Sequence, residues 1–525
     1  MITVNRGLIL LFRTVKFKGI TFFISFILVQ RVLLAGIFPI KSNPIHAISA
    51  ARIQQEFTLG SRYFFMNTNN TDQVGTDFYA NGLNVNLNYQ YDNLFDRFPL
   101  KVKDSLVKYH RLNFVASYSQ ISNLNSSDLS LSNRYEIGLF DLQNPSIRNF
   151  GNLTLCYLNY ENRKYHVDLK VGRMIPSSPF INAQDGRLRP TSIQGAQLAF
   201  HKNSKSKNRY FNVDLNLATN ILARSTGSWK SINESIGLYP QGVSVFGKPA
   251  QYIQKNSTIG NSVFFSTFNF LQFFGKKENE PNLIGAQYHV LYMDKLMFTN
   301  MFNLEGAVSV NKDFNIGAAA MWIHQQFLVD SAGTVPEKRY AETNEKSNVY
   351  SSKLWFDYKT LNSKHTLNFA MTNISNEGRY LMPREWGKDP FYTFMPRERN
   401  EGFGNVHAYT VNYIARGDIR NMPNSFPLKS LSLDLGYGNY SLPDVKNFRL
   451  NKYGMPSFQQ INAVLGFDFS LKRSSKYFKQ HTVNLKLWYI QKINSGDTYN
   501  LVKYISNKVD MTQVNIVLNY LITIF

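Results

Sequence analysis

The chain has 525 residues, of which 43% are apolar and 14% are aromatic, and this composition excludes a disordered protein. The formal net charge of +23 is compatible with nucleic acid, anionic lipid headgroups or an anionic small solute as a partner. A single cysteine, Cys156, excludes an internal disulfide framework and any CxxC metal or redox site.

The N-terminus has the pattern of an export signal. A basic region that extends to Lys18 precedes the apolar run ITFFISFILV at 20–29, and small residues follow at VLLAG and again at HAISAA. This order predicts a signal over 1–36, with cleavage as late as residue 50 as an alternative. A membrane-anchor helix is the other interpretation, although Gln30 and Arg31 interrupt the apolar run. Beyond residue 36 no apolar run is long enough for a membrane-spanning helix, so a membrane location would require strands.

Apolar and polar residues alternate with a period of two in many later segments. In QINAVLGFDFSL at 460–471, Ile461, Leu465 and Phe467 fall on one face, while Asn462 and Asp468 fall on the other. The same alternation predicts strands over 210–218, 353–358, 431–438, 481–489 and 514–522. One polar and one apolar face per strand fits an antiparallel sheet around a dry core, or a transmembrane barrel with lipid outside and water inside.

The connections favour the barrel. Long polar segments at 225–260 and 328–348 predict extended loops, whereas NSKH at 362–365 predicts a tight turn. Alternating short and long connections, charged residues on the polar faces and the export signal together predict a transmembrane antiparallel β-barrel of about sixteen to twenty strands. A soluble β-propeller is the rival fold, but no regular repeat of about forty to fifty residues is present.

The last strand carries an irregular assembly signal. Its apolar residues from Ile516 to Ile524 occupy even positions, so the terminal Phe525 is out of phase with them. An aromatic C-terminus is typical of outer-membrane barrels, and we therefore expect the barrel-assembly machinery as a partner during biogenesis.

Motifs of the common enzyme classes are absent. The sequence contains no HExxH, no GxSxG and no GxxxxGK[ST]. We therefore predict no catalytic residue, no cofactor and no metal ligand, although a catalytic site built without these motifs stays open.

The segment REWGKDPFYTFMPRERNEG at 384–402 combines charged with aromatic residues. In an extended conformation Arg397, Arg399 and Glu401 would point to one side and Glu398 to the other. Two guanidinium groups side by side suit carboxylate binding, because each can donate two parallel hydrogen bonds. The aromatic half would wedge the segment against the barrel wall. The alternative is that these charges only pair with one another and brace a loop.

Four blocks, at 171–198, 384–411, 435–462 and 507–520, resemble the OprD family of outer-membrane porins and occur in the order expected for it. The resemblance covers most of the chain after residue 56. It implies a single barrel domain over 56–525 with eighteen strands, either monomeric or loosely homotrimeric. It also implies long extracellular loops partly folded inward, a narrow constriction and a ladder of basic side chains for carboxylate-bearing nutrients.

The resemblance also implies candidate pore residues. Arg173 and Arg187 match the GR and RxxP pattern of the family, whereas Arg189 stands where that pattern usually has an apolar residue. For Lys452 a turn set by Gly454 and Pro456 is favoured over contact with the solute, and for the arginines a wall-bracing ion pair is the alternative. The candidate constriction residues are Arg173, Arg187, Arg384, Glu385, Arg397, Glu398, Arg399, Glu401 and Lys452.

These features predict a porin in the outer membrane of a Gram-negative bacterium. We expect passive, substrate-selective diffusion of small anionic or carboxylate-bearing nutrients, with solutes and outer-membrane lipid as partners and no nucleic acid. The alternative is a barrel that is not a channel, either an adhesin or a membrane-embedded enzyme. A soluble basic nucleic-acid binder is disfavoured by the periodic aromatic faces.

Overall fold

The computed structural model describes most of the chain after residue 54. The described residues are 55–70, 77–97, 109–129, 138–141, 143–144, 146–184, 186–203, 208–238, 242–252, 260–274, 282–329, 335–397, 399–419, 427–471, 480–496 and 510–524. They belong to one compact unit, Ile53–Phe525. The predicted export signal over 1–36, Glu398 and Phe525 lie outside the described residues.

Nearly all regular structure in the described residues is β-strand. The long strands are β1 (Gln55–Asn70), β2 (Phe78–Tyr91), β3 (His110–Ser126), β4 (Asn149–Asn162), β5 (Val167–Met174), β6 (Ser192–Asn203), β7 (Arg209–Leu222), β9 (Val263–Phe273), β10 (Leu283–Met293), β11 (Met297–Ser309), β12 (Phe314–Phe327), β13 (Lys346–Lys359), β14 (Ser363–Ile374), β15 (Val406–Asp418), β16 (Leu428–Ser441), β17 (Phe458–Leu471), β18 (Gln480–Asn494) and β19 (Met511–Thr523). The short elements are β8 (Lys230–Ser231), α4 (Ile232–Ser235), η1 (Leu94–Arg97), η3 (Pro336–Lys338) and η4 (Arg384–Trp386). Among the described residues, no helix has the length and apolarity that crossing a bilayer requires.

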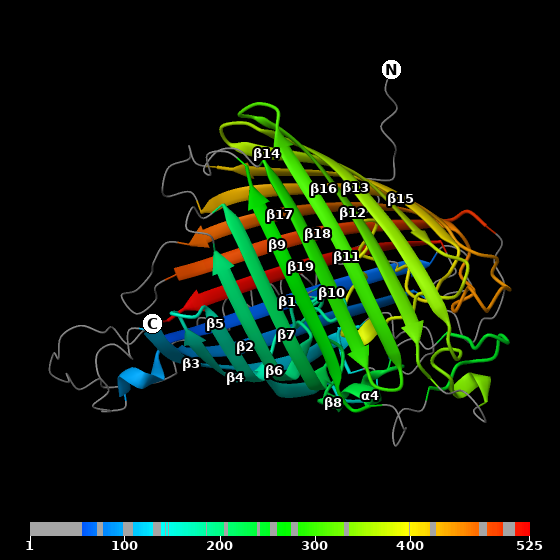
Figure 1. The fold of residues 1–525 in the computed structure, drawn as a ribbon, viewed down its shortest axis with the longest axis horizontal. Helices are drawn as coiled ribbons and strands as arrows, with labels where there is room; N and C mark the ends of the chain where they lie inside the picture. Colours follow the sequence, from blue (N-terminus) through cyan, green and yellow to red (C-terminus); the bar gives the residue numbers. More distant parts are fainter. Residues whose placement is uncertain are drawn as a thin grey trace. The chain divides into compact units, whose positions relative to one another are not determined.

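The long strands close into a single antiparallel barrel. Each pairs with its neighbours in chain order, and the first strand pairs with the last over Thr58↔Thr523 to Asn70↔Met511. Figure 1 shows this closure, with the blue β1 beside the red β19. The short β8 pairs only with the end of β7, which itself pairs directly with β9. The barrel therefore has eighteen strands, which confirms the predicted fold class and strand number.

Alternation along each strand sorts apolar side chains outward and polar side chains inward. On β17, Ile461 and Leu465 are 41% and 40% exposed, whereas Asn462 between them is buried. Leu465 pairs with Leu433 of β16, so the apolar face continues onto the next strand. Exposed apolar residues on strands all around the barrel would be costly in water, and a lipid environment removes that cost. The polarity predicted for 460–471 is confirmed.

Most of the long connections lie at one end of the barrel, which also carries the short turn 294–296. One end carries the connections 175–191, 223–262, 328–345, 375–405 and 442–457, while the other carries the short turns 163–166, 310–313 and 360–362. The two predicted loops at 225–260 and 328–348 are confirmed within a few residues. The tight turn lies at 360–362, slightly before its predicted place, because Ser363 already begins β14 and accepts a backbone hydrogen bond from Thr360.

Loops that fold into the barrel share the main hydrophobic core with inward-facing strand residues. Phe180 and Ile181 of the connection 175–191, and Trp386 and Phe391 of the connection 375–405, are all at most 3% exposed. They share one cluster with inward-facing strand residues such as Phe458. The loops therefore fill part of the barrel's interior at the end where they originate.

The closed sheet predicts anomalous migration on a denaturing gel. A barrel without a free edge has no strand from which unzipping can begin, so protein extracted without boiling should keep its compact form in detergent. We expect the unheated sample to migrate at a different apparent mass from the boiled sample. Identical migration of the two samples would contradict a closed barrel.

Candidate functional site

A cavity of about 860 Å³ lies inside the barrel and is bounded by both walls and loops. Strands β1, β18 and β19 contribute residues such as Arg62, Lys486 and Asn515, and the wall formed by β7, β9 and β10 contributes others such as Asn269 and His289. Between these walls, the connections 175–191, 223–262 and 375–405 also line the space. Three loops and two sides of the barrel thus meet around one cavity.

The cavity is strongly cationic. Its described lining includes the basic residues Arg62, Arg187, Arg224, Arg384, Lys388, Arg397, Arg399 and Lys486. The acidic residues in the same lining are Asp214 and Glu385. Because protein lines the cavity on several sides, this excess of positive charge acts in a medium of lower effective dielectric constant than bulk water.

The aromatic half of the segment 384–402 anchors it to the barrel. The indole N–H of Trp386, which is fully buried, donates to Ser235 Oγ at 2.8 Å. The Tyr392 hydroxyl donates to Asn303 Oδ1 of β11 at 2.5 Å, and Thr393 Oγ1 donates to Thr372 Oγ1 of β14 at 2.8 Å. The segment consists of η4 followed by turns and is not extended, which corrects the strand-like geometry assumed for it. The aromatic half of the segment packs against the barrel wall, as predicted.

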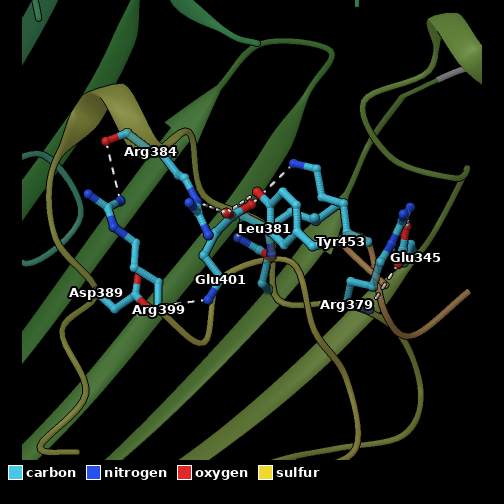
Figure 2. A network of polar contacts seen from close by, with 10 residues as sticks. Glu345, Arg379, Leu381, Arg384, Asp389, Arg399, Glu401 and Tyr453 are labelled. Atoms are coloured by element: carbon cyan, nitrogen blue, oxygen red, sulfur yellow. Dashed lines mark hydrogen bonds and ion pairs between the residues drawn. The ribbon is translucent and has the colours of Figure 1, made fainter. Parts of the chain in front are cut away.

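A buried ion cluster holds the charged half of this segment. Glu401 is 1% exposed, and its carboxylate accepts hydrogen bonds from Arg384 Nε at 3.1 Å, Lys452 Nζ at 3.3 Å and the Tyr453 hydroxyl at 2.6 Å (Figure 2). Lys452 comes from the connection 442–457, which Gly454 turns with a φ of 53°. The cluster therefore ties two loops together.

Charge partners keep the members of this cluster ionised. Burial alone would raise the pKa of Glu401, but Lys452, Arg384 and the Tyr453 hydroxyl hold that pKa below its ordinary value. Burial likewise opposes the charge on Lys452, yet Glu401 raises the pKa of the lysine overall. Both groups are charged at neutral pH, and each neutralises the other.

A second buried carboxylate fixes the backbone of the same loop. Asp389 accepts backbone hydrogen bonds from Asn400 at 2.8 Å and Glu401 at 3.2 Å. Burial raises the pKa of Asp389, and Arg399 beside it partly offsets that rise. The guanidinium of Arg399 donates to the Arg384 carbonyl oxygen at 3.3 Å, so its position is set by the loop backbone (Figure 2).

The structure divides the predicted candidates into cavity-lining and bracing residues. Arg187, Arg384, Glu385, Arg397 and Arg399 line the cavity. Glu401 and Lys452 lie in the buried cluster instead, so the bracing alternative given for the segment 384–402 describes Glu401, and Lys452 is its partner.

Arg173 lies away from the cavity. On β5 it falls on the same face as Val171, which is 52% exposed, and its guanidinium lies 4.8 Å from the Trp229 ring. Because side chains alternate along a strand, Arg173 points outward, as Val171 does. It also donates a hydrogen bond to Gln194 Oε1 of β6 at 3.1 Å and so braces the wall. Arg189 is 1% exposed and donates to the carbonyl oxygens of Ala223 and Thr226, as expected for a residue outside the lumen.

Four basic residues of the cavity were not among the candidates. Lys486 lies on the same face of β18 as Asn484, and that polar pattern could have identified it. Arg62 shares its face of β1 with the apolar Phe64 and Met66, so alternation does not mark it. Lys388 belongs to the segment 384–402, whereas nothing in the sequence around Arg224 marks it. Within the described ranges, no group of three or more His, Cys, Asp or Glu side chains is arranged to hold a metal ion.

Removing the charge of Glu401 should loosen the loop. Glu401→Gln leaves the buried Lys452 without the carboxylate that neutralises it, and breaking a buried pair in this way costs about 3–5 kcal/mol. We expect trypsin to cleave the native variant within 384–402, which mass spectrometry of the fragments would show.

The matched control is Glu337→Gln. The Glu337 carboxylate lies 3.5 Å from Lys248 Nζ, and the Lys248 side chain is 72% exposed. An exposed pair contributes only about 0–1 kcal/mol, so this variant should leave the segment 384–402 as resistant as it is in the wild type. Wild-type resistance of Glu401→Gln would show that the cluster does not hold the loop.

Comparison with known proteins finds similarity in the fold. No protein-family model and no curated protein matches the sequence. Among solved structures, the outer-membrane protein OpdK of Pseudomonas aeruginosa is 13% identical, with a TM-score of 0.58 over 90% of this chain and 99% of that one. OccAB4 of Acinetobacter baumannii is 13% identical, with a TM-score of 0.59 over 90% and 99% of the two chains. The resemblance seen in the sequence is thus confirmed for the fold, and this chain has the eighteen-stranded barrel fold of the OprD-type porins.

Proposed function

We propose that this protein is an outer-membrane porin of the OprD type that lets small anionic or carboxylate-bearing nutrients diffuse down their gradients. The observation that carries the proposal is the cavity between the inward-folded loops, where basic lining residues greatly outnumber acidic ones. No covalent chemistry and no cofactor are needed, because selectivity arises from the charge and width of the passage.

The electrostatics of the loops support this assignment. Buried carboxylates neutralise some of the basic residues, as Glu401 does for Lys452. Arg187 and Arg397 are only partly buried and line the cavity. An entering carboxylate would exchange part of its hydration shell for charge-assisted hydrogen bonds from such groups.

The similar structures are consistent with the same class of solute. One of them is OpdK of Pseudomonas aeruginosa solved with vanillate, and it is 14% identical with a TM-score of 0.57 over 89% of this chain. Vanillate carries a carboxylate. For the present chain a carboxylate-bearing solute is a proposal supported by the cationic cavity.

The main alternative is a barrel that does not conduct. The inward-folded loops and their shared core could close the passage, as in an adhesin or a membrane-embedded enzyme. Purified protein in a planar lipid bilayer distinguishes the two functions, because a plugged barrel gives no discrete conductance steps.

Charge reversal in the cavity should invert the ion preference of the channel. Arg187→Glu with Arg397→Glu changes the lining by four charges and leaves the buried Glu401 cluster intact. We expect the wild type to prefer anions and the double variant to shift toward cations, measured as reversal potentials under a salt gradient. The shift should shrink at high salt, because the Debye length falls from about 30 Å at 0.01 M to about 3 Å at 1 M.

A matched double variant controls for net charge. Lys164→Glu with Lys312→Glu makes the same change at exposed residues in turns at the opposite end of the barrel. Its reversal potential should stay close to that of the wild type. If the cavity variant folds and conducts with wild-type selectivity at low salt, the cavity arginines do not select the solute.

A further inference from the structure

We infer that Asn182 acts as a clamp that sets the width of the passage by fixing the connection 175–191 to the connection 375–405. This inference rests on the proposed channel function and assigns to one residue a positioning role in it. We call the contact of Asn182 with Trp386, Gly387 and Lys388 the Asn182 clamp.

The clamp is a set of hydrogen bonds between segments far apart in the sequence. The backbone N–H of Asn182 donates to the Trp386 carbonyl oxygen at 2.8 Å. Its side-chain Nδ2 donates to the Lys388 carbonyl oxygen at 3.1 Å, while Oδ1 accepts from the Lys388 backbone N–H at 3.1 Å. One asparagine thus satisfies both the donor and the acceptor of Lys388.

The geometry on both sides is adapted to this contact. Gly387 has a φ of 155°, and a Cβ placed on it would lie 2.5 Å from Asn182 Cγ, so a larger residue would push the amide away. On the other side, Ser177 and Asn182 form a β-bridge, and Phe180 and Ile181 between them are buried. The backbone of Asn182 is therefore held in place independently of the clamp.

The clamp lies where it can control the opening. Asn182 and Lys388 both line the cavity, and each loop contributes one of the cavity arginines that we propose to contact the solute, Arg187 and Arg397. Trp386 is also bonded to Ser235 of α4, which extends the connection to a third loop. With the loops joined at Asn182, the distance between the two sets of basic side chains is fixed.

The test compares Asn182→Ala with Asn269→Ala. Both changes remove the same atoms from the cavity lining, but Asn269 lies on β9 and not on a loop. For Asn182→Ala we expect larger conductance steps, permeation by anions above the wild-type size limit and a smaller preference for anions. Asn269→Ala should retain the wild-type size limit, and an equal effect of the two variants would overturn the inference.

A reversible lock provides the second arm. The Cβ position of Gly387 lies 2.5 Å from Asn182 Cγ, and one C–C bond of about 1.5 Å separates Cγ from Cβ, so the two Cβ positions are at most about 4 Å apart and close enough for a disulfide to be attempted. In a Cys156→Ser background, Asn182→Cys with Gly387→Cys should show the wild-type size limit when oxidised and the limit of Asn182→Ala after reduction. An unchanged size limit on reduction of a bond that has formed would contradict the clamp.

Hydrogen exchange separates failure of the clamp from failure of the proposed function. In Asn182→Ala the backbone amide of Lys388 loses its acceptor, and we expect it to exchange roughly threefold to tenfold faster. This measurement requires no conduction. A wild type without conductance steps would refute the proposed channel function. An exchange rate at the Lys388 amide that is the same in Asn182→Ala and in the wild type would refute the clamp, whether or not the protein conducts.

Discussion

Closure of the sheet is the constraint on which the rest of this structure depends. Once β1 pairs with β19, every strand has two partners, and the period-two pattern must direct one face of each strand into the interior. That interior face carries polar side chains together with buried apolar ones such as Phe265 and Ile323. Inward-folded loops add further apolar side chains to this interior, through residues such as Trp386 and Phe180.

Loops that enter a barrel must satisfy their own charges and backbone groups. The segment 384–402 does so with two buried carboxylates, since Glu401 neutralises Lys452 and Arg384 while Asp389 accepts backbone N–H groups. These paired charges and hydrogen bonds hold the loop in position. Arg397, which is only partly buried and lines the cavity, is among the basic residues that we propose to act on a solute.

The sequence predicted the barrel well because alternation is a local property that each strand displays by itself. It also predicted that Arg397 and Arg399 face the same space, although their segment is not extended. It did not pair Glu401 with Lys452, because their burial depends on two loops that meet only in the folded chain. Arg173 is different. It lies two residues after the apolar Val171 on β5, so alternation alone would have placed it on the outward face of the barrel.

Width and charge preference have separate physical origins in this arrangement. The Asn182 clamp consists of hydrogen bonds between neutral amide groups, which dissolved salt does not screen. The field of the cavity arginines, in contrast, decays over a Debye length and weakens as salt is added. The largest permeant anion should therefore be the same at low and high salt, while the preference for anions over cations should fall. A size limit that widened together with the loss of charge preference would mean that the arginines, and not the clamp, hold the loops apart.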